Sequence, residues 1–157
     1  MGGCLAPMNA YLNIIGMETL GLRMERVCNN AFRLAQALEK LEGVSVNYPL
    51  LESSPYHELA EKQLSGKGGA ILTIRAGSKE RAYKLINHLK YVKIATNIGD
   101  VRTLVIHPAS TIYIHSTPEA MAEAGVYDDT IRISVGIEDI KDLIQDFTEA
   151  VESLGEE

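Results

Sequence analysis

Apolar and polar positions along this chain follow two different periods, and these periods predict most of its helices and strands. Over residues 6–41 the period is helical, and Gly43 stands just beyond as a C-terminal cap. The apolar positions in the second half of this segment, at steps of three and four, are Val27, Ala31, Leu34, Ala35, Leu38 and Leu41. The pattern predicts one unusually long helix that buries one face.

The first half of the same segment is apolar around much of its circumference. Leu12, Ile14, Ile15 and Met17 do not share one narrow stripe. A helix that is apolar on several sides is expected to be covered by protein on several sides. Gly16 is a position at which such a helix could bend.

The remainder of the chain alternates short helices with short strands. Strands are predicted over 44–48, 69–75, 92–95, 103–107, 111–114 and 130–135. Helices are predicted over 56–64, after Ser78, after Thr117 as far as Gly125, and after Gly136. The predicted fold class is α+β, with a small, largely antiparallel sheet, helices packed on one face and a long N-terminal helix.

Charge and cysteine content narrow the class of protein. The formal net charge is -6 and no basic cluster occurs, which argues against nucleic acid or an anionic membrane as a partner. No apolar run reaches the roughly 20 residues that span a bilayer. Cys4 and Cys28 would lie roughly 36 Å apart on one long helix, at about 1.5 Å per residue, and could not form a disulfide. We therefore expect a cytoplasmic protein without a structural metal.

Several short motifs have simple structural explanations. The glycine-rich segment SGKGGA, residues 65–70, lacks the spacing of a phosphate-binding loop and is better explained as a tight turn. Glu138 and Asp139 are better explained as charges at the start of a helix than as an acid and base pair. The histidines are scattered, and none stands in a nucleophile arrangement: His57, His88, His107 and His115.

Arg132 is the side chain with the strongest chemical potential. In an alternating strand it points away from the face formed by Ile131, Ile133 and Val135. Its planar guanidinium could capture a carboxylate through two hydrogen bonds, or it could simply form an ion pair at the surface. The residue pattern leaves both interpretations open.

Three stretches of the sequence carry a family resemblance. They are GMETLGLRMERVCNNAFRLAQALE, YVKIATNIGDVRTLVIHPAST and GVYDDTIRISVGIEDIKDLIQDF. In order and spacing they resemble the cysteine and methionine metabolism family of fold-type-I pyridoxal-phosphate enzymes. The resemblance runs nearly from end to end, and the middle stretch is most similar to the O-acetylhomoserine sulfhydrylase branch.

The resemblance implies a role for two residues. In the family, the arginine of the RxSxGxE segment binds the α-carboxylate of the amino-acid substrate, and this position is Arg132 here. A small hydroxyl residue after the NxGxxx stretch helps to position that carboxylate, and here it is Thr103. The preceding residue is Arg102, as in sulfhydrylases, where cystathionine lyases tend to carry glutamate.

The chain departs from the family pattern in two ways. The segment with the Schiff-base lysine, and the residues that hold the cofactor ring and phosphate, have no counterpart here. The segment TIYIHS, residues 111–116, differs from the TTH of many relatives. The resemblance thus implies an interdomain helix region over 1–41 and a C-terminal α+β domain over 42–157, without the N-terminal cofactor domain. No catalytic, cofactor-binding or metal-binding residue is expected in this chain.

The activity implied for the parent enzyme is the conversion of O-acetyl-L-homoserine and sulfide, or a thiol, to homocysteine and acetate with pyridoxal phosphate. This chain alone is expected to be inactive and to bind no cofactor. Its expected partners are an amino-acid substrate and a pyridoxal-phosphate domain, in the same or a separate polypeptide, and it could form a homo-oligomer. The alternatives are a fragment of cystathionine γ-synthase or methionine γ-lyase, or a non-enzymatic amino-acid-binding or interaction module.

Overall fold

A five-stranded sheet is the centre of the computed structural model, which describes residues 3–155. The strands are β1 (Ser45–Asn47), β2 (Ile71–Arg75), β3 (Lys93–Ile94), β4 (Leu104–Ile106) and β5 (Thr130–Ser134). Their order across the sheet is β1-β2-β5-β4-β3, and every neighbouring pair is antiparallel except β3 and β4. The predicted small, mostly antiparallel sheet is confirmed.

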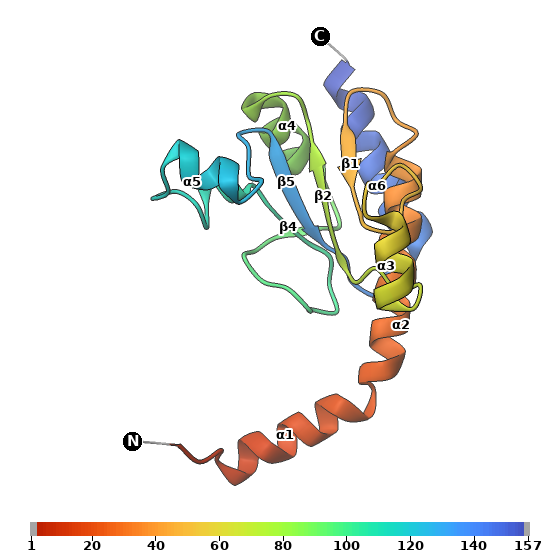
Figure 1. Cartoon of the computed structure of the whole chain (residues 1–157), viewed down its shortest axis with the longest axis vertical. Helices are drawn as coiled ribbons and strands as arrows, with labels where there is room; N and C mark the ends of the chain where they lie inside the picture. The colour runs from red at the N-terminus through yellow and green to blue at the C-terminus, as the bar shows by residue number, and fades with distance from the viewer. Residues whose placement is uncertain (1–2, 156–157) are drawn as a thin grey trace.

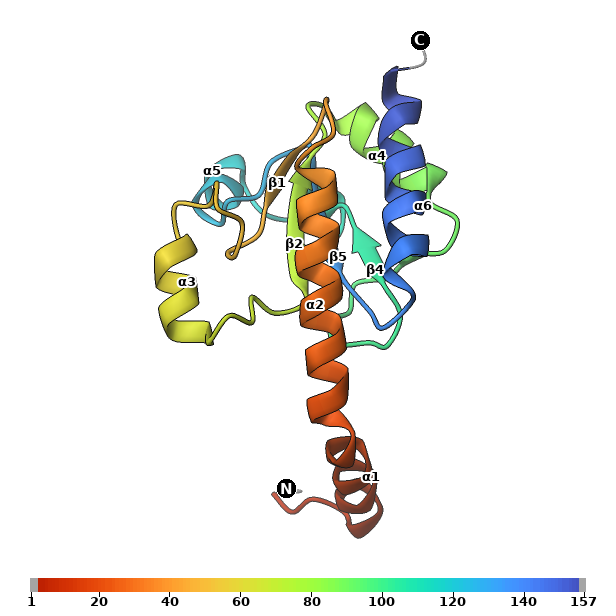
Figure 2. The same ribbon diagram turned by 90° about the vertical axis from the view of Figure 1, so that its right-hand side faces the viewer.

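Three of the helices cover one face of this sheet (Figures 1 and 2). The helices are α1 (Pro7–Glu18), α2 (Leu20–Leu38), α3 (His57–Leu64), α4 (Lys79–His88), α5 (Pro118–Glu123) and α6 (Ile140–Glu152), with 3-10 turns at Pro108–Ser110 and Ser153–Gly155. Helices α2, α4 and α6 pack on the sheet and on one another, whereas α5 lies away from them. Helices α4 and α5 begin directly after Ser78 and Thr117, as predicted. Both residues are N-caps, because their side chains accept hydrogen bonds from backbone amides.

The N-terminal segment differs from its prediction as one long helix. It is two helices that meet at Thr19, whose backbone angles, φ -106° and ψ 6°, are not helical, and α1 turns sharply away from α2 (Figure 1). Arg23 donates to the carbonyl of Gly16 and to the Thr19 hydroxyl, so a side chain satisfies a carbonyl that the helix end leaves free. The single helix predicted over 6–41 is therefore wrong.

The same segment ends earlier than its apolar pattern suggests. Helix α2 stops at Leu38, and Gly43 follows in a turn with φ 86°. Threonine is a poor helix former and the two neighbouring glycines, Gly16 and Gly21, are poorer still, which explains why the break falls in this part of the segment. An apolar period records which side chains could share a face, but it does not record where the backbone stops being helical.

The hydrophobic core lies between the sheet and the three packed helices. The side chains of Ile131 and Ile133 on β5, Leu34 on α2, and Leu143 and Phe147 on α6 are all 0% exposed. The alternation predicted for β5 is confirmed, because its apolar side chains enter this core. The division of the chain at residues 41 and 42 stays a prediction, although the second half of α2 contributes to the same core.

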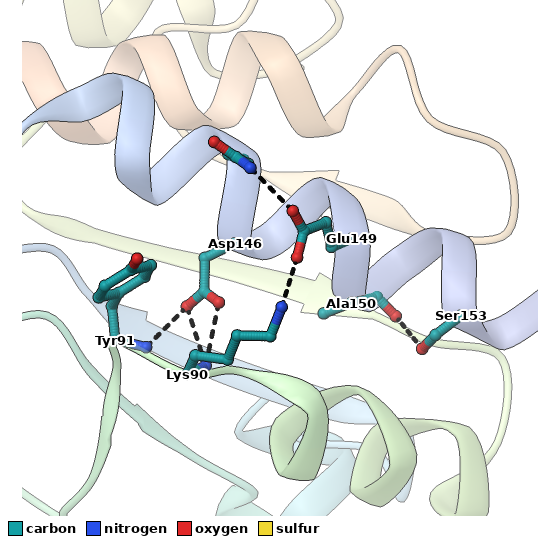
Figure 3. A network of polar contacts seen from close by, with 7 residues as sticks. Lys90, Tyr91, Asp146, Glu149, Ala150 and Ser153 are labelled. Carbon is teal, nitrogen blue, oxygen red and sulfur yellow. Dashed lines mark hydrogen bonds and ion pairs between the residues drawn. The ribbon is translucent and has the colours of Figure 1, made fainter.

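A buried carboxylate joins α6 to the segment that leads into β3 (Figure 3). Asp146 is 2% exposed, and its two oxygens accept hydrogen bonds from the backbone amides of Lys90 and Tyr91 at 2.9–3.2 Å. At the surface beside it, the Lys90 ammonium pairs with Glu149 at 2.6 Å. These contacts fix the end of α4 relative to α6.

The strand predicted over 111–114 is absent from the described part of the chain. Its residues form turns, in which the carbonyl of Pro108 accepts from the amides of Thr111 and Tyr113 at 3.1 and 3.0 Å. Ile112 and Ile114 are 51% and 61% exposed, so their alternation does not correspond to a buried face. Alternation over four residues was too short a signal to distinguish a strand from a turn.

Between residues 3 and 155, every helix is too short or too polar to cross a bilayer.

Candidate functional site

Arg132 lies on the face of the sheet that α2, α4 and α6 leave uncovered. Its neighbours across the sheet are Thr73 on β2 and Ile106 on β4. The guanidinium nitrogen Nη2 donates to the backbone carbonyl of Asn97 at 3.3 Å. Among residues 3–155, no acidic side chain forms an ion pair with Arg132. The surface ion pair that the sequence left open is therefore not formed within this part of the chain.

A second arginine on the same face, Arg75, does have an acidic partner. Arg75, two residues along β2 from the cross-strand partner of Arg132, pairs with Asp129 at 2.8 Å and stacks on the ring of Tyr127 at 4.1 Å from its centre. A second oxygen of Asp129 accepts from the amide of Gly77 at 3.1 Å. The charge of Arg75 is thus compensated inside the fold, whereas the charge of Arg132 has no acidic partner among residues 3–155.

The segment from residue 95 to residue 103 faces Arg132. It is largely exposed, it turns at Gly99 with φ 77°, and the Asp100 carboxylate accepts from the amide of Arg102 at 2.9 Å. Asn97 in this loop was not singled out from the sequence, although it begins the NIGDVRT stretch. The only signal that could have found it was its membership in that stretch, because its contact with Arg132 spans 35 residues.

Thr103, the second predicted substrate-binding residue, is 0% exposed. Its hydroxyl donates to Oε2 of Glu138 at 2.8 Å and accepts from the amide of Gly136 at 2.9 Å. Its own amide donates to Oε1 of Glu138 at 2.5 Å. The role of Thr103 toward a substrate stays a prediction, and these contacts favour positioning of the loop over direct contact with a ligand.

Glu138 does not serve as the helix-start charge that the sequence suggested. Asp139 takes that position, because its side chain accepts from the amide of Lys141 at 2.8 Å. The Glu138 carboxylate turns back to Thr103 instead. The hydroxyl of Ser134 also lies near this region, and it is buried without a hydrogen-bond partner among residues 3–155.

The other sequence candidates have structural roles. The SGKGGA segment is a turn, as predicted, with positive φ at Ser65, Gly66 and Gly69. His107 is 4% exposed and contacts the Asp128 carbonyl at 2.6 Å and the Ser110 hydroxyl at 2.9 Å, in agreement with a packing role. Within the described residues, no group of three histidine, cysteine or acidic side chains is placed to hold a metal ion.

The chemical feature of this face is an arginine without an acidic partner among residues 3–155, beside an exposed loop. The family model for "Cys/Met metabolism PLP-dependent enzyme" matches residues 1–152. The chain therefore belongs to this family of pyridoxal-phosphate-dependent enzymes of sulfur amino-acid metabolism.

Individual relatives agree with the family. A protein named homocysteine synthase from Schizosaccharomyces pombe is 46% identical over 154 residues, which is 97% of this chain and 36% of that protein. A protein named L-methionine gamma-lyase from Treponema denticola is 42% identical over 154 residues, which is 98% of this chain and 38% of that protein. The relatives thus carry names of more than one activity within the family.

A solved structure has the same fold. A Campylobacter jejuni protein with N'-pyridoxyl-lysine-5'-monophosphate matches at a TM-score of 0.91 and 37% identity, over 96% of this chain and 36% of that chain. This chain spans less than half the length of each of these relatives.

The lysines of residues 3–155 do not fit the reactive lysine that pyridoxal phosphate requires. A lysine that binds this cofactor needs to be partly withdrawn from water so that its amine is reactive. Every lysine in the chain is exposed, and two of them, Lys67 and Lys90, form surface ion pairs with Glu25 and Glu149. A charged group that this sheet face does present is the guanidinium of Arg132.

Proposed function

We propose that this chain is the C-terminal, substrate-carboxylate-binding part of a pyridoxal-phosphate-dependent O-acetylhomoserine sulfhydrylase. The parent enzyme converts O-acetyl-L-homoserine and sulfide, or a thiol, to homocysteine and acetate. The observation that carries the proposal is the uncompensated Arg132 on the open sheet face, within the RxSxGxE segment. The name homocysteine synthase of the Schizosaccharomyces pombe relative supports the product.

The task of Arg132 is to orient the substrate. One of its nitrogens contacts the Asn97 carbonyl, which holds the guanidinium beside the loop and leaves other N–H groups for a carboxylate. Two parallel charge-assisted hydrogen bonds fix the plane as well as the position of the carboxylate. A fixed carboxylate in turn fixes the amino group and the Cα–H bond of the amino acid, so the contribution is one of positioning.

The groups that carry out the bond-making steps belong to another part of the parent enzyme. Pyridoxal phosphate supplies the electron sink for this chemistry when bound. The exposed apolar side chains of α1, among them Leu12, Ile14 and Met17, are suited to cover a surface of that other part. We therefore expect the isolated chain to be inactive. We expect α1 to contact a cofactor-bearing domain in the same or a separate polypeptide.

A methionine γ-lyase part is the second candidate, because one relative bears that name at 42% identity. Arg102, which the sequence associates with the sulfhydrylase branch, is exposed within the loop, and its backbone amide donates to the Asp100 carboxylate. Assay of the holoenzyme with O-acetyl-L-homoserine plus sulfide, and separately with L-methionine, separates the two activities. Homocysteine formed from O-acetyl-L-homoserine and sulfide supports the sulfhydrylase, whereas methanethiol formed from L-methionine supports the lyase.

Replacement of Arg132 tests the proposal. Arg132→Lys keeps a charge but loses the two-point contact, and we expect kcat/KM for O-acetyl-L-homoserine in the holoenzyme to fall by about 10- to 100-fold, since a hydrogen bond to a charged group contributes about 1.5–3 kcal/mol. Most of the loss should be in KM. NMR titration of the 157-residue chain with O-acetyl-L-homoserine should show the matching loss of shifts around Arg132.

Arg75→Lys is the matched control. It changes the same residue type on the same sheet face, but Arg75 is already engaged with Asp129 and Tyr127. We expect it to leave KM within about twofold of wild type, because an interaction that is compensated inside the fold adds little to ligand binding. Equal effects of the two substitutions, or no effect of Arg132→Lys, would contradict the proposed function.

A further inference from the structure

Two segments that are far apart in the sequence meet just beyond the end of β5. One is the loop of residues 97–103, and the other is the turn of residues 136–138 that follows β5. The amide of Ile137 donates to the carbonyl of Val101 at 3.0 Å, and the Glu138 carboxylate accepts two hydrogen bonds from Thr103. The loop is therefore attached to the turn through both backbone and side-chain contacts.

The contact is close-packed as well as hydrogen-bonded. A Cβ atom added at Gly136 would lie 2.4 Å from the Val101 carbonyl oxygen and 2.5 Å from Oε2 of Glu138. Only glycine lets the two segments approach this closely. A small change in the position of the Glu138 carboxylate would therefore be transmitted to the loop rather than absorbed by free space.

The turn is itself held from the opposite side by α2. The side-chain amide of Asn30, which is 1% exposed, donates to the carbonyls of Gly136 and Glu138 at 3.0 and 2.9 Å. Arg26, one turn earlier on the helix, donates to the carbonyl of Glu138 at 3.0 Å. The carboxylate that holds Thr103 is thus mounted on a backbone that the core helix fixes.

We propose that Glu138 is a positioning residue that holds the 97–103 loop where Arg132 meets it. This inference rests on the proposed function, and it extends that function from the residue that contacts the carboxylate to one that acts through another residue. The path runs from Asn30 to the 136–138 turn, from Glu138 to Thr103, and along the loop to the Asn97 carbonyl that contacts Arg132. Glu138 itself does not touch the substrate.

A role of Glu138 limited to overall stability predicts something different. Such a role would lower the unfolding midpoint but leave the substrate affinity of the folded molecule unchanged. A positioning role predicts that the affinity falls even where the variant is fully folded, because the loop no longer restrains Arg132. The substrate affinity of the folded variant and the hydrogen-exchange protection of its loop amides therefore distinguish a positioning role of Glu138 from a purely stabilising one.

The test compares Glu138→Gln with the adjacent Asp139→Asn, a matched control that removes a charge one residue away at the cap of α6. In the 157-residue chain we expect hydrogen exchange of the loop amides to quicken by about tenfold in Glu138→Gln only. In the holoenzyme we expect KM for O-acetyl-L-homoserine to rise by about tenfold with kcat within about twofold. Asp139→Asn should lower the unfolding midpoint without either effect.

Thr103 supplies a second pair of variants. Thr103→Ser keeps the hydroxyl and its contacts with Glu138 and Gly136, so hydrogen exchange of the loop amides should stay close to that of wild type. Thr103→Val keeps the shape but removes the hydroxyl, and it should quicken loop exchange as Glu138→Gln does. If Glu138→Gln does not fold, the comparison of loop exchange between Thr103→Val and Thr103→Ser tests the positioning role instead. Unchanged loop exchange and unchanged KM in the folded variants would overturn the positioning role.

Failure of the proposed function has a different signature. If Glu138→Gln quickens loop exchange but neither wild type nor Arg132→Lys responds to O-acetyl-L-homoserine, Glu138 still positions the loop and the carboxylate-binding role of Arg132 is the part that fails. If Arg132→Lys weakens binding while Glu138→Gln changes nothing, the carboxylate site stands and the inference about Glu138 is wrong.

Discussion

Helices α1 and α6 are both rich in apolar residues, yet they have opposite relations to the core. Ile140, Leu143, Phe147 and Val151 of α6 are at most 4% exposed, whereas no residue of α1 is buried. The apolar positions of α6 form one stripe that a single surface can cover. Those of α1 are distributed around the helix, so one neighbouring surface cannot cover them.

The contrast teaches that apolar content and burial are separate properties of a helix. An isolated helix of the length of α1, 12 residues, is marginal in water, because helix nucleation is costly and little packing offsets it. The side chains of Met8, Tyr11 and Met17 are 66%, 58% and 60% exposed. A surface of this kind is expected to associate with another polypeptide surface.

Removal of a core side chain from α6 should have the largest effect on stability. Phe147→Ala deletes a ring that is 0% exposed between α6 and the sheet, and we expect the free energy of unfolding to fall by about 3–5 kcal/mol. Urea denaturation followed by circular dichroism measures the change. Leu12→Ala on α1 is the control, and it should leave the free energy of unfolding within about 0.5 kcal/mol of wild type. A comparable loss from Leu12→Ala would show that α1 packs on the domain after all.

Loss of the buried carboxylate of α6 should have an intermediate effect. Asp146→Asn replaces one acceptor oxygen by an NH₂ group that faces the amides of Lys90 and Tyr91 (Figure 3). Loss of hydrogen bonds to a charged group should lower the free energy of unfolding by about 1.5–3 kcal/mol. Thermal unfolding measures the loss, and hydrogen exchange at Lys90 and Tyr91 should quicken. A midpoint equal to that of wild type would mean that these amides find other partners.

The surface ion pair beside Asp146 should have the smallest effect on stability, and the size of that effect depends on pH. The hydrogen bond from Lys90, then that from Gln145, lowers the pKa of Glu149, and the hydrogen bond to Glu149 raises the pKa of Lys90. The Glu149 contribution is therefore present above its unfolded pKa and is lost as pH falls through the lower folded pKa. The Lys90 contribution is present below its unfolded pKa and is lost as pH rises through the higher folded pKa.

Glu149→Gln checks this expectation. We expect a slightly lower unfolding midpoint at neutral pH and no difference from wild type in strong acid, where Glu149 is protonated in both states. High salt should shrink the difference further, because the pair is exposed and screened. A difference that persists in acid would assign the effect to packing or to the Gln145 contact rather than to charge.

Local physics explains which parts of the fold could be predicted. The period of two in β5 and the period near 3.6 in α6 depend only on backbone geometry, so the buried side chains of both elements follow from their spacing. The same geometry placed Arg132 on the face opposite Ile131 and Ile133. The strand expected over 111–114 and the continuous helix through Thr19 failed because short alternation and apolar content do not report backbone breaks.

The sequence by itself determined most of the elements, the core side of β5 and α6, the outward direction of Arg132 and the family resemblance, because each depends on residues that are neighbours in the chain. Only the tertiary structure decided that Arg132 meets the Asn97 loop, that Arg75 is already compensated, and that Glu138 reaches back to Thr103. The last contact spans 35 residues and exists because the 136–138 turn packs on α2 and on the loop together. Contacts of that separation depend on how whole elements pack, which no local period records.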